Sequence, residues 1–180
     1  MSSSTDTMTA TQVYRVYIKA TPEAIWDAIT KPEWSQKFGY GGVADYDLRP
    51  GGRANIHASE AMKEAGAAKG WPVPDEIVEG EIVEADPPRR LVQTWRLMMD
   101  PELAAEGATR LTYEIDPNPA GVTKLTVTHE LENKPKLALV VSGQTEMAGG
   151  GWPWILSDLK TLLESGSSMV AGEWLDDSSN

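Results

Sequence analysis

The chain has 180 residues, no cysteine and a formal net charge of −11, with 16 Lys and Arg against 27 Asp and Glu. This length suits one domain with a sizeable core. The lack of cysteine excludes a disulfide framework and thiol chemistry, and favours a cytoplasmic setting. The excess of acidic residues argues against nucleic acid and anionic membrane surfaces as partners, and no stretch approaches the roughly 20 apolar residues of a membrane span.

The N-terminal part predicts a leader, a strand and two short helices. Residues 1–12 are mostly Ser, Thr and Met without periodicity, which predicts a disordered leader. Apolar and polar residues alternate over 13–20, as in a half-buried strand. Thr21-Pro22-Glu23 then supplies an N-cap, a first-turn proline and an acid for a helix that ends before Pro32. A second short helix is predicted from Pro32 to Lys37.

From Val43 the pattern changes to antiparallel sheet. The expected strands cover residues 43–48, 53–58, 76–85, 90–97, 110–116 and 123–131. The glycines of Arg49-Pro50-Gly51-Gly52 predict a tight hairpin between the first two of these strands. Two excursions interrupt the meander, 59–74 and 98–108. Short helices are predicted within both excursions and over 135–141.

A long amphipathic helix is predicted from Trp152 to Glu164. Its apolar stripe contains Trp152, Ile155, Leu156, Leu159, Leu162 and Leu163, and Asp158 lies at the border of that stripe. Gly166 predicts a left-handed C-terminal stop. Residues 166–180 are largely polar and acidic and predict a flexible tail, so removing the chain after Gly166 is expected to leave the melting temperature nearly unchanged.

The helix needs a large apolar partner surface, which the strands supply, and the combination predicts an α+β architecture. A curved sheet of six to seven strands around such a helix is expected to leave a cavity between the two layers. Small residues on the inward face, Ala54, Ala58 and Gly80, are expected to leave that space open. The folded domain is predicted to cover residues 13–165.

Five segments in this order resemble one protein family. They are Ala20 to Ala28 (ATPEAIWDA), Asp47 to Arg53 (DLRPGGR), Gly80 to Trp95, Lys124 to Glu130 (KLTVTHE), and Gly151-Trp152 with Leu156, Leu159 and Leu163. Together they resemble the Aha1-like domain, named after the activator of Hsp90 ATPase, of the START/Bet v 1-like helix-grip superfamily. The resemblance implies a helix-grip fold, with two short helices after the first strand and a curved antiparallel sheet wrapped around a long C-terminal helix.

Alternation along the strands predicts which side chains line the cavity. The candidate lining residues are Ile56, Gln93, Trp95, Tyr113, Val127, His129, Trp152 and Leu156. Among them His129 is either a ligand-orienting or proton-transferring group, or a neutral histidine held by structural hydrogen bonds, which is the favoured interpretation. Burial predicts a pKa below 6.5 for its imidazole. His57 is predicted to face solvent.

The sequence leaves three functions open. The first is non-catalytic binding of a small, largely apolar molecule in the cavity; the second is a cyclase- or dehydratase-type enzyme that uses His129. The third is a stress-linked or co-chaperone-like interaction module. With two histidines and no cysteine the sequence predicts no metal site, and with no phosphate-binding glycine loop it predicts no cofactor. A homodimer is considered as a further assembly.

Overall fold

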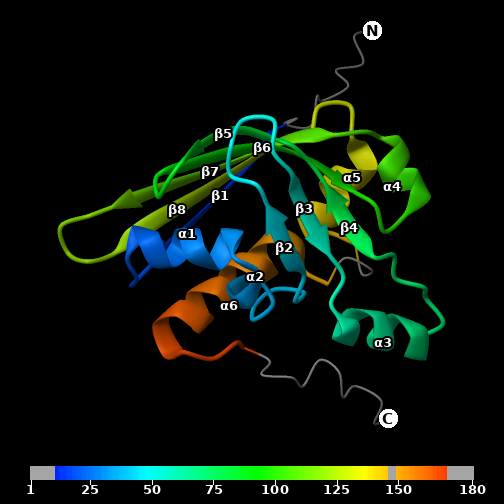
Figure 1. The fold of residues 1–180 in the computed structure, drawn as a ribbon, viewed down its shortest axis with the longest axis horizontal. Coiled ribbons are helices and arrows are strands. Elements are labelled where there is room, and N and C mark those ends of the chain that lie inside the picture. Colours follow the sequence, from blue (N-terminus) through cyan, green and yellow to red (C-terminus); the bar gives the residue numbers. More distant parts are fainter. Residues whose placement is uncertain (1–10, 146–148, 170–180) are drawn as a thin grey trace, which may run out of the picture.

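Eight antiparallel strands form one sheet in the order β1-β8-β7-β6-β4-β3-β2, and β5 pairs with β6 beside β4. The computed structural model describes residues 11–145 and 149–169. The sheet curves around the helices α1 (Pro22–Thr30), α2 (Pro32–Ser35) and α6 (Gly151–Ser165), which lie together on its concave side (Figure 1). The strands are β1 (Thr11–Ile18), β2 (Val43–Tyr46), β3 (Ala54–His57), β4 (Glu76–Glu79), β5 (Ile82–Asp86), β6 (Arg90–Leu97), β7 (Thr109–Pro117) and β8 (Thr123–Glu130).

Local signals in the sequence account for the helices. Thr21 caps the first helix by accepting a hydrogen bond from the N–H of Ala24 (3.2 Å), and that helix ends where Lys31 adopts an extended conformation before Pro32. Short helices also form in both excursions and after β8, as predicted. The helices are α1 (Pro22–Thr30), α2 (Pro32–Ser35), α3 (Glu60–Ala68), α4 (Pro101–Ala105), α5 (Pro135–Val141) and α6 (Gly151–Ser165).

The strand predicted over 76–85 is broken in two at Gly80. A Cβ atom on Gly80 would lie 2.1 Å from the carbonyl oxygen of Thr94, because the backbones of β4, β5 and β6 meet there. The N–H of Gly80 donates to Asn55 Oδ1 at 3.1 Å, which holds this break against β3. The sheet therefore has eight strands, one more than the upper end of the predicted range. The close approach of the strands leaves no room for a side chain at position 80 and so requires glycine there. This corrects the expectation that Gly80 leaves room for a cavity.

β1 begins at Thr11, two residues earlier than predicted. The amide of Gln12 explains the extension, since Nε2 donates to the carbonyl of Ala138 (3.0 Å) and Oε1 accepts from the Tyr14 hydroxyl (2.6 Å). Gln12 thus joins the start of the sheet to α5. The rest of the predicted leader, residues 1–10, lies outside the described residues, as does 170–180 of the predicted tail.

The core lies between the concave face of the sheet and the helices α1 and α6. The sheet, α1 and α6 all contribute side chains that are almost fully excluded from solvent there, namely Ile18, Ile25, Leu111, Ile115, Leu125 and Leu159. α6 begins at Gly151, where a Cβ would lie 2.3 Å from the carbonyl oxygen of Val141. It ends at Gly166, which has a φ of 83° and returns its N–H to Leu162, as predicted.

Asp158 of α6 is fully buried, although the helical wheel places it at the border of the apolar stripe. Its carboxylate accepts hydrogen bonds from the N–H of Gly39 (2.8 Å), the hydroxyl of Ser168 (2.8 Å) and the N–H of Met169 (2.7 Å). Three separate segments therefore meet at one buried carboxylate: the loop after α2, the middle of α6 and the chain that follows α6.

Candidate functional site

The concave face of the sheet has a closed half and an open half. On β7 and β8 the inward side chains from Thr109 to Ile115 and from Thr123 to His129 are all buried. On β2, β3 and β6 the large inward side chains Tyr46, Ile56, Trp95 and Leu97 remain partly exposed. α6 packs along β1, while α1 contacts both β7 and β2 and α2 contacts β2. We call the part of the concave face that these four residues form the open half.

A chain of hydrogen bonds runs through the floor of the site at the boundary between the two halves. The indole N–H of Trp152 donates to His129 Nδ1 at 3.2 Å. His129 Nε2 lies 2.8 Å from the hydroxyl of Thr109, and that hydroxyl donates to the carbonyl of Trp95 at 2.7 Å. The chain thus links the start of α6 to β8, β7 and β6.

These partners determine the tautomer of His129. The single hydroxyl proton of Thr109 is used on Trp95, so its oxygen accepts from a proton on His129 Nε2. Nδ1 then carries the lone pair that accepts from Trp152. Both ring nitrogens are satisfied in the neutral form, and a second proton would meet the indole N–H.

Burial disfavours the charged form of this imidazole. The ring is fully excluded from solvent, and burial lowers the pKa of His129 from 6.5 to about 3. Trp95 and Trp152 contact its ring edge to face, with centroids 5.1 and 6.1 Å away. The expectation of a depressed pKa is confirmed in direction, and the geometry matches the structural interpretation of His129 better than the catalytic one.

Gln93 is another buried polar side chain on this face. It points inward from β6 between Leu91 and Trp95 and is fully excluded from solvent. Its amide N–H group makes one long contact with the carbonyl of Thr94 (3.4 Å) and a side-chain hydrogen bond with the hydroxyl of Tyr46, while its Oε1 accepts no hydrogen bond from any described residue. A buried amide oxygen without a donor carries a desolvation penalty of about 1–3 kcal/mol.

Tyr46 brings a hydroxyl beside this amide from the open half. Burial raises the pKa of Tyr46 to about 12, and the neighbouring Gln93 amide opposes that rise. The phenol is therefore neutral at physiological pH and able to donate or accept. Nearby, burial also raises the pKa of Tyr113, with Tyr46 adding to the effect. The polar groups at this point are all uncharged.

The other predicted lining residues are mostly core residues. Tyr113, Val127, Trp152 and Leu156 are buried in the main hydrophobic cluster. Ile56 and Trp95 are half-buried, and they also contact a second cluster formed by Ala58, Met62, Ile77 and Val78. The structure therefore gathers Trp95, His129 and Trp152 around one point, with Gln93 on the same row of the sheet beyond Leu111.

Two shallow, open hollows lie on the opposite, convex face of the sheet. The larger has a volume of about 360 Å³ and is lined by Thr11, Arg90, Arg110, Thr112, Glu114, Thr128 and Glu130. Its arginines are paired with acids, Arg90 with Glu114 at 2.8 Å and Arg110 with Glu130 at 3.5 Å. Beneath α6, predicted lining residues such as Val127 and Leu156 are instead buried in the main hydrophobic cluster.

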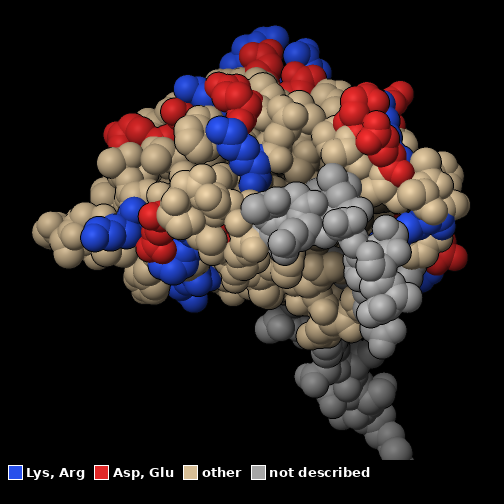
Figure 2. Space-filling model, turned by 90° about the horizontal axis from the view of Figure 1, so that it is seen from below, with Lys and Arg blue, Asp and Glu red and all other residues tan. Residues whose placement is uncertain are grey.

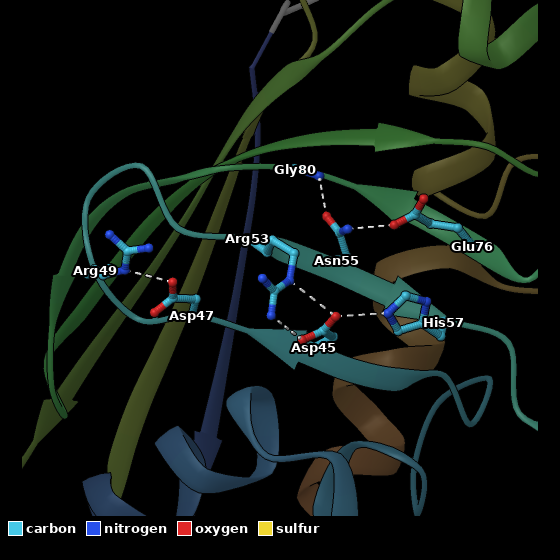
Figure 3. A network of polar contacts seen from close by, with 8 residues as sticks. All are labelled: Asp45, Asp47, Arg49, Arg53, Asn55, His57, Glu76 and Gly80. Carbon is cyan, nitrogen blue, oxygen red and sulfur yellow. Dashed lines mark hydrogen bonds and ion pairs between the residues drawn. The ribbon is translucent and has the colours of Figure 1, made fainter.

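A polar network covers the convex face of β2, β3 and β4 (Figure 3). Asp45 accepts from His57 Nε2 at 3.0 Å and from Arg53 at 3.3 Å. These hydrogen bonds, that of His57 first, lower the pKa of the Asp45 carboxyl. The His57 side chain is 40% exposed, in line with its predicted outward position, and the network is a solvated ion-pair cluster.

Three residues of structural or chemical importance escaped the sequence analysis. Thr109 lies one residue before the predicted start of its strand, so its inward position was missed. Tyr46 was expected merely as part of a strand, and Asp158 as a border residue. Alternation along β2 places Tyr46 on the same face as Ala44, so the sequence pattern could have predicted its inward position. The partners of Asp158 come from segments distant in sequence, so no local pattern marks it.

Three further findings concern a membrane, a metal ion and charged partners. None of the helices in the described part of the chain is long and apolar enough to cross a membrane. Among the described residues, no three His, Asp or Glu side chains gather in a way that could hold a metal ion. The basic side chains on the face shown in Figure 2 are interspersed with acidic ones.

Comparisons with known proteins agree with the fold. A similar solved structure is protein MLL2253 from Mesorhizobium loti, with 24% identity, a TM-score of 0.61 and coverage of 86% of this chain and 96% of that chain. CalU16 from Micromonospora echinospora has 19% identity and a TM-score of 0.56, covering 86% and 76%. An Hsp90 activator from Plasmodium falciparum has 19% identity and a TM-score of 0.56, covering 86% and 96%. No curated protein sequence matches the chain.

At these identities the solved structures establish a shared fold, the helix-grip arrangement of a curved antiparallel sheet around a C-terminal helix. The family is established by a sequence model described as "Activator of Hsp90 ATPase homolog 1-like protein", which matches residues 19–164. This range contains all five segments on which the resemblance was based. The chain therefore belongs to the family of activator of Hsp90 ATPase homolog 1-like proteins.

Proposed function

We propose that this protein binds a small, largely apolar molecule at the open half of its concave face, between the sheet and α6. The observation that carries the proposal is the contrast between the two halves. Large apolar side chains at Tyr46, Ile56, Trp95 and Leu97 stay partly exposed on a face whose other half is closed. Exposed apolar surface of this kind, beside a few placed polar groups, is typical of ligand sites.

The ligand would bind by displacing side chains more than by filling a ready-made hole. Tyr46, Ile56, Trp95 and Leu97 are packed against the hydrophobic clusters, so entry requires these half-buried residues to move apart. Trp95 is suited to this because it contacts both hydrophobic clusters. A bound molecule would replace contacts between those clusters and bury the remaining exposed apolar area, at about 25 cal/mol per Å².

The proposal assigns His129 to holding the floor of the site and not to proton transfer. Both of its ring nitrogens are engaged, by Trp152 and by Thr109, and its low pKa leaves it a poor base near neutral pH. The same chain of hydrogen bonds keeps Trp95 and Trp152 in fixed relation, which preorganises the two aromatic walls that a ligand would contact.

Fluorescence titration tests the proposal. N-phenyl-1-naphthylamine, an uncharged fluorophore, is expected to bind the folded protein with one-site saturation and to quench tryptophan emission. Replacing Trp95 by Phe should remove most of the quenching. The matched control is Trp71→Phe, at a residue that is 56% exposed in the loop after α3, and it should leave the quenching unchanged.

Failure of the fluorophore to bind well-folded protein would overturn the proposal, and so would quenching that depends on Trp71 in place of Trp95. Native mass spectrometry of freshly purified protein provides an independent test, because a co-purifying molecule should appear at a fixed mass above that of the chain. The same spectrum reports whether the chain forms the homodimer considered from the sequence.

A further inference from the structure

Gln93 provides a hydrogen-bond acceptor that the fold itself does not use. Its Oε1 is fully buried and receives no donor from the described residues, while its Nε2 has the long contact to Thr94. Reversing the amide would bring its oxygen to the Tyr46 hydroxyl, but would also set that oxygen against the Thr94 carbonyl and leave Nε2 without an acceptor. Buried side-chain amides in proteins are almost always hydrogen-bonded, so this one requires an explanation.

The comparison with Gln12 makes the point sharper. The two glutamines lie on one row across the sheet, because Gln12 pairs with His129, His129 with Leu111 and Leu111 with Gln93. Gln12 uses both ends of its amide, on Ala138 and Tyr14. His129 uses both ring nitrogens. In this row Gln93 is the residue whose oxygen has no donor within the described part of the chain, and it is the one next to the open half.

The surroundings of Gln93 restrict what could supply the donor. Its neighbours on the concave face are apolar or aromatic, and the polar groups at hand, Tyr46 and Tyr113, are phenols whose raised pKa values keep them neutral. No Lys, Arg, Asp or Glu occupies an inward position on β2, β3 or β6. A charged ligand group would therefore lose its hydration without gaining a counter-charge.

We infer that the ligand of the open half is an uncharged, largely apolar molecule with one O–H or N–H group, which donates to Gln93 Oε1. The inference rests on the proposed function, which it refines by assigning the chemical class of the ligand. Tyr46 lies at the same point and is able to accept or donate a second hydrogen bond. A site built to satisfy a buried acceptor discriminates against an analogue of the same shape that lacks the donor.

Matched probes test this inference. 2-Naphthol and 2-methylnaphthalene have nearly the same shape, but one carries a hydroxyl where the other carries a methyl group. Each is titrated against N-phenyl-1-naphthylamine bound to the wild-type protein. We expect the dissociation constant of 2-naphthol to be lower by about fivefold, the ratio that one net hydrogen bond provides. The wild-type comparison does not depend on the folding of any variant.

Three variants then locate the acceptor. Gln93→Leu should abolish the preference for 2-naphthol while 2-methylnaphthalene binds at least as well as before. Gln12→Leu, the control on the same row, should retain the preference, because its amide is already used within the fold. Tyr46→Phe should leave a preference of at least twofold. If Tyr46→Phe abolishes the preference and Gln93→Leu retains it, Gln93 is not the acceptor and the inference fails.

The outcomes separate the inference from the proposed function. Equal binding of both probes to the wild type would overturn the donor requirement while the apolar site still stands. Displacement by neither probe, together with no saturable binding of N-phenyl-1-naphthylamine, would overturn the proposed function and the inference with it. A preference for 2-methylnaphthalene would also overturn the inference, because it would mean that the Gln93 oxygen is satisfied within the protein.

Discussion

Shortening the chain after Gly166 is predicted to destabilise the protein substantially, because it removes two of the three donors to a buried carboxylate. Asp158 is fully excluded from solvent and accepts hydrogen bonds from Gly39, Ser168 and Met169. A chain that ends at Gly166 keeps just the first of these. This replaces the sequence-based expectation that the segment after Gly166 contributes little to stability.

The size of the effect follows from the contacts. A hydrogen bond to a charged group contributes about 1.5–3 kcal/mol, and water that reaches the carboxylate after truncation offsets part of the loss of two such bonds. We therefore expect the free energy of unfolding to fall by about 2–4 kcal/mol. For a protein of this size each kcal/mol shifts the melting temperature by about 2–4 °C, so the expected fall is about 5–15 °C.

The assay compares thermal unfolding of the full chain with two truncated forms, one ending at Gly172 and one at Gly166. The Gly172 form keeps both donors and controls for the loss of chain length and acidic residues. Melting temperatures of the two truncated forms within about 2 °C of each other would refute the reasoning. Asp158→Asn in the full chain should give a loss of similar size, since the amide can no longer accept at both oxygens.

Further predictions concern His129 and two glycines. The folded-state pKa of His129 is about 3, below its ordinary value of 6.5, so the unfolded chain binds the proton first as pH falls. The contribution of His129 to the free energy of unfolding is fully present above about pH 6.5 and declines by about 1.4 kcal/mol per pH unit toward pH 3. Urea unfolding from pH 7 to pH 5 should show this slope, and His129→Gln should reduce it. Trp152→Phe removes the donor to His129 Nδ1 and should cost about 1–3 kcal/mol in the same assay, while a ring NMR titration should still find a depressed His129 pKa. Gly80→Ala places a Cβ 2.1 Å from a backbone oxygen and should lower the free energy of unfolding by more than about 2 kcal/mol. Gly121→Ala meets no atom within 4 Å and should lower it by about 1–2 kcal/mol, from its positive φ alone. Equal losses would show that close strand approach is not the reason for Gly80.

Much of the fold could be predicted from the sequence because its determinants are local. The Thr21-Pro22 start of α1, the Pro32 boundary and the Gly166 stop depend on a few neighbouring residues, so they appear in the sequence and again in the structure. Alternation along β8 likewise predicted that His129 points inward with Leu125 and Val127. The break at Gly80 was missed because it depends on Thr94, a residue of the next strand but one.

The site was predicted less completely than the fold. Alternation predicted the inward direction of Gln93, Trp95 and His129, since side-chain direction along a strand has a period of two residues. It could not predict that Trp152 and Thr109 satisfy both nitrogens of His129, because these partners lie 23 and 20 residues away in the sequence. It also could not show that predicted lining residues such as Val127 and Leu156 are buried in the main hydrophobic cluster, because packing depends on how every layer fits together.

The sequence by itself therefore determined the family, the order of elements and the face on which each strand residue lies, because these depend on spacing and on short-range backbone preferences. The tertiary structure alone decided which buried polar groups are satisfied. It paired His129 and Gln12 completely, gave Asp158 donors from two other segments and, among the described residues, left Gln93 Oε1 without a donor. Hydrogen bonding requires atoms to meet within about 3 Å at defined angles, and such meetings between distant segments exist only once the chain has folded.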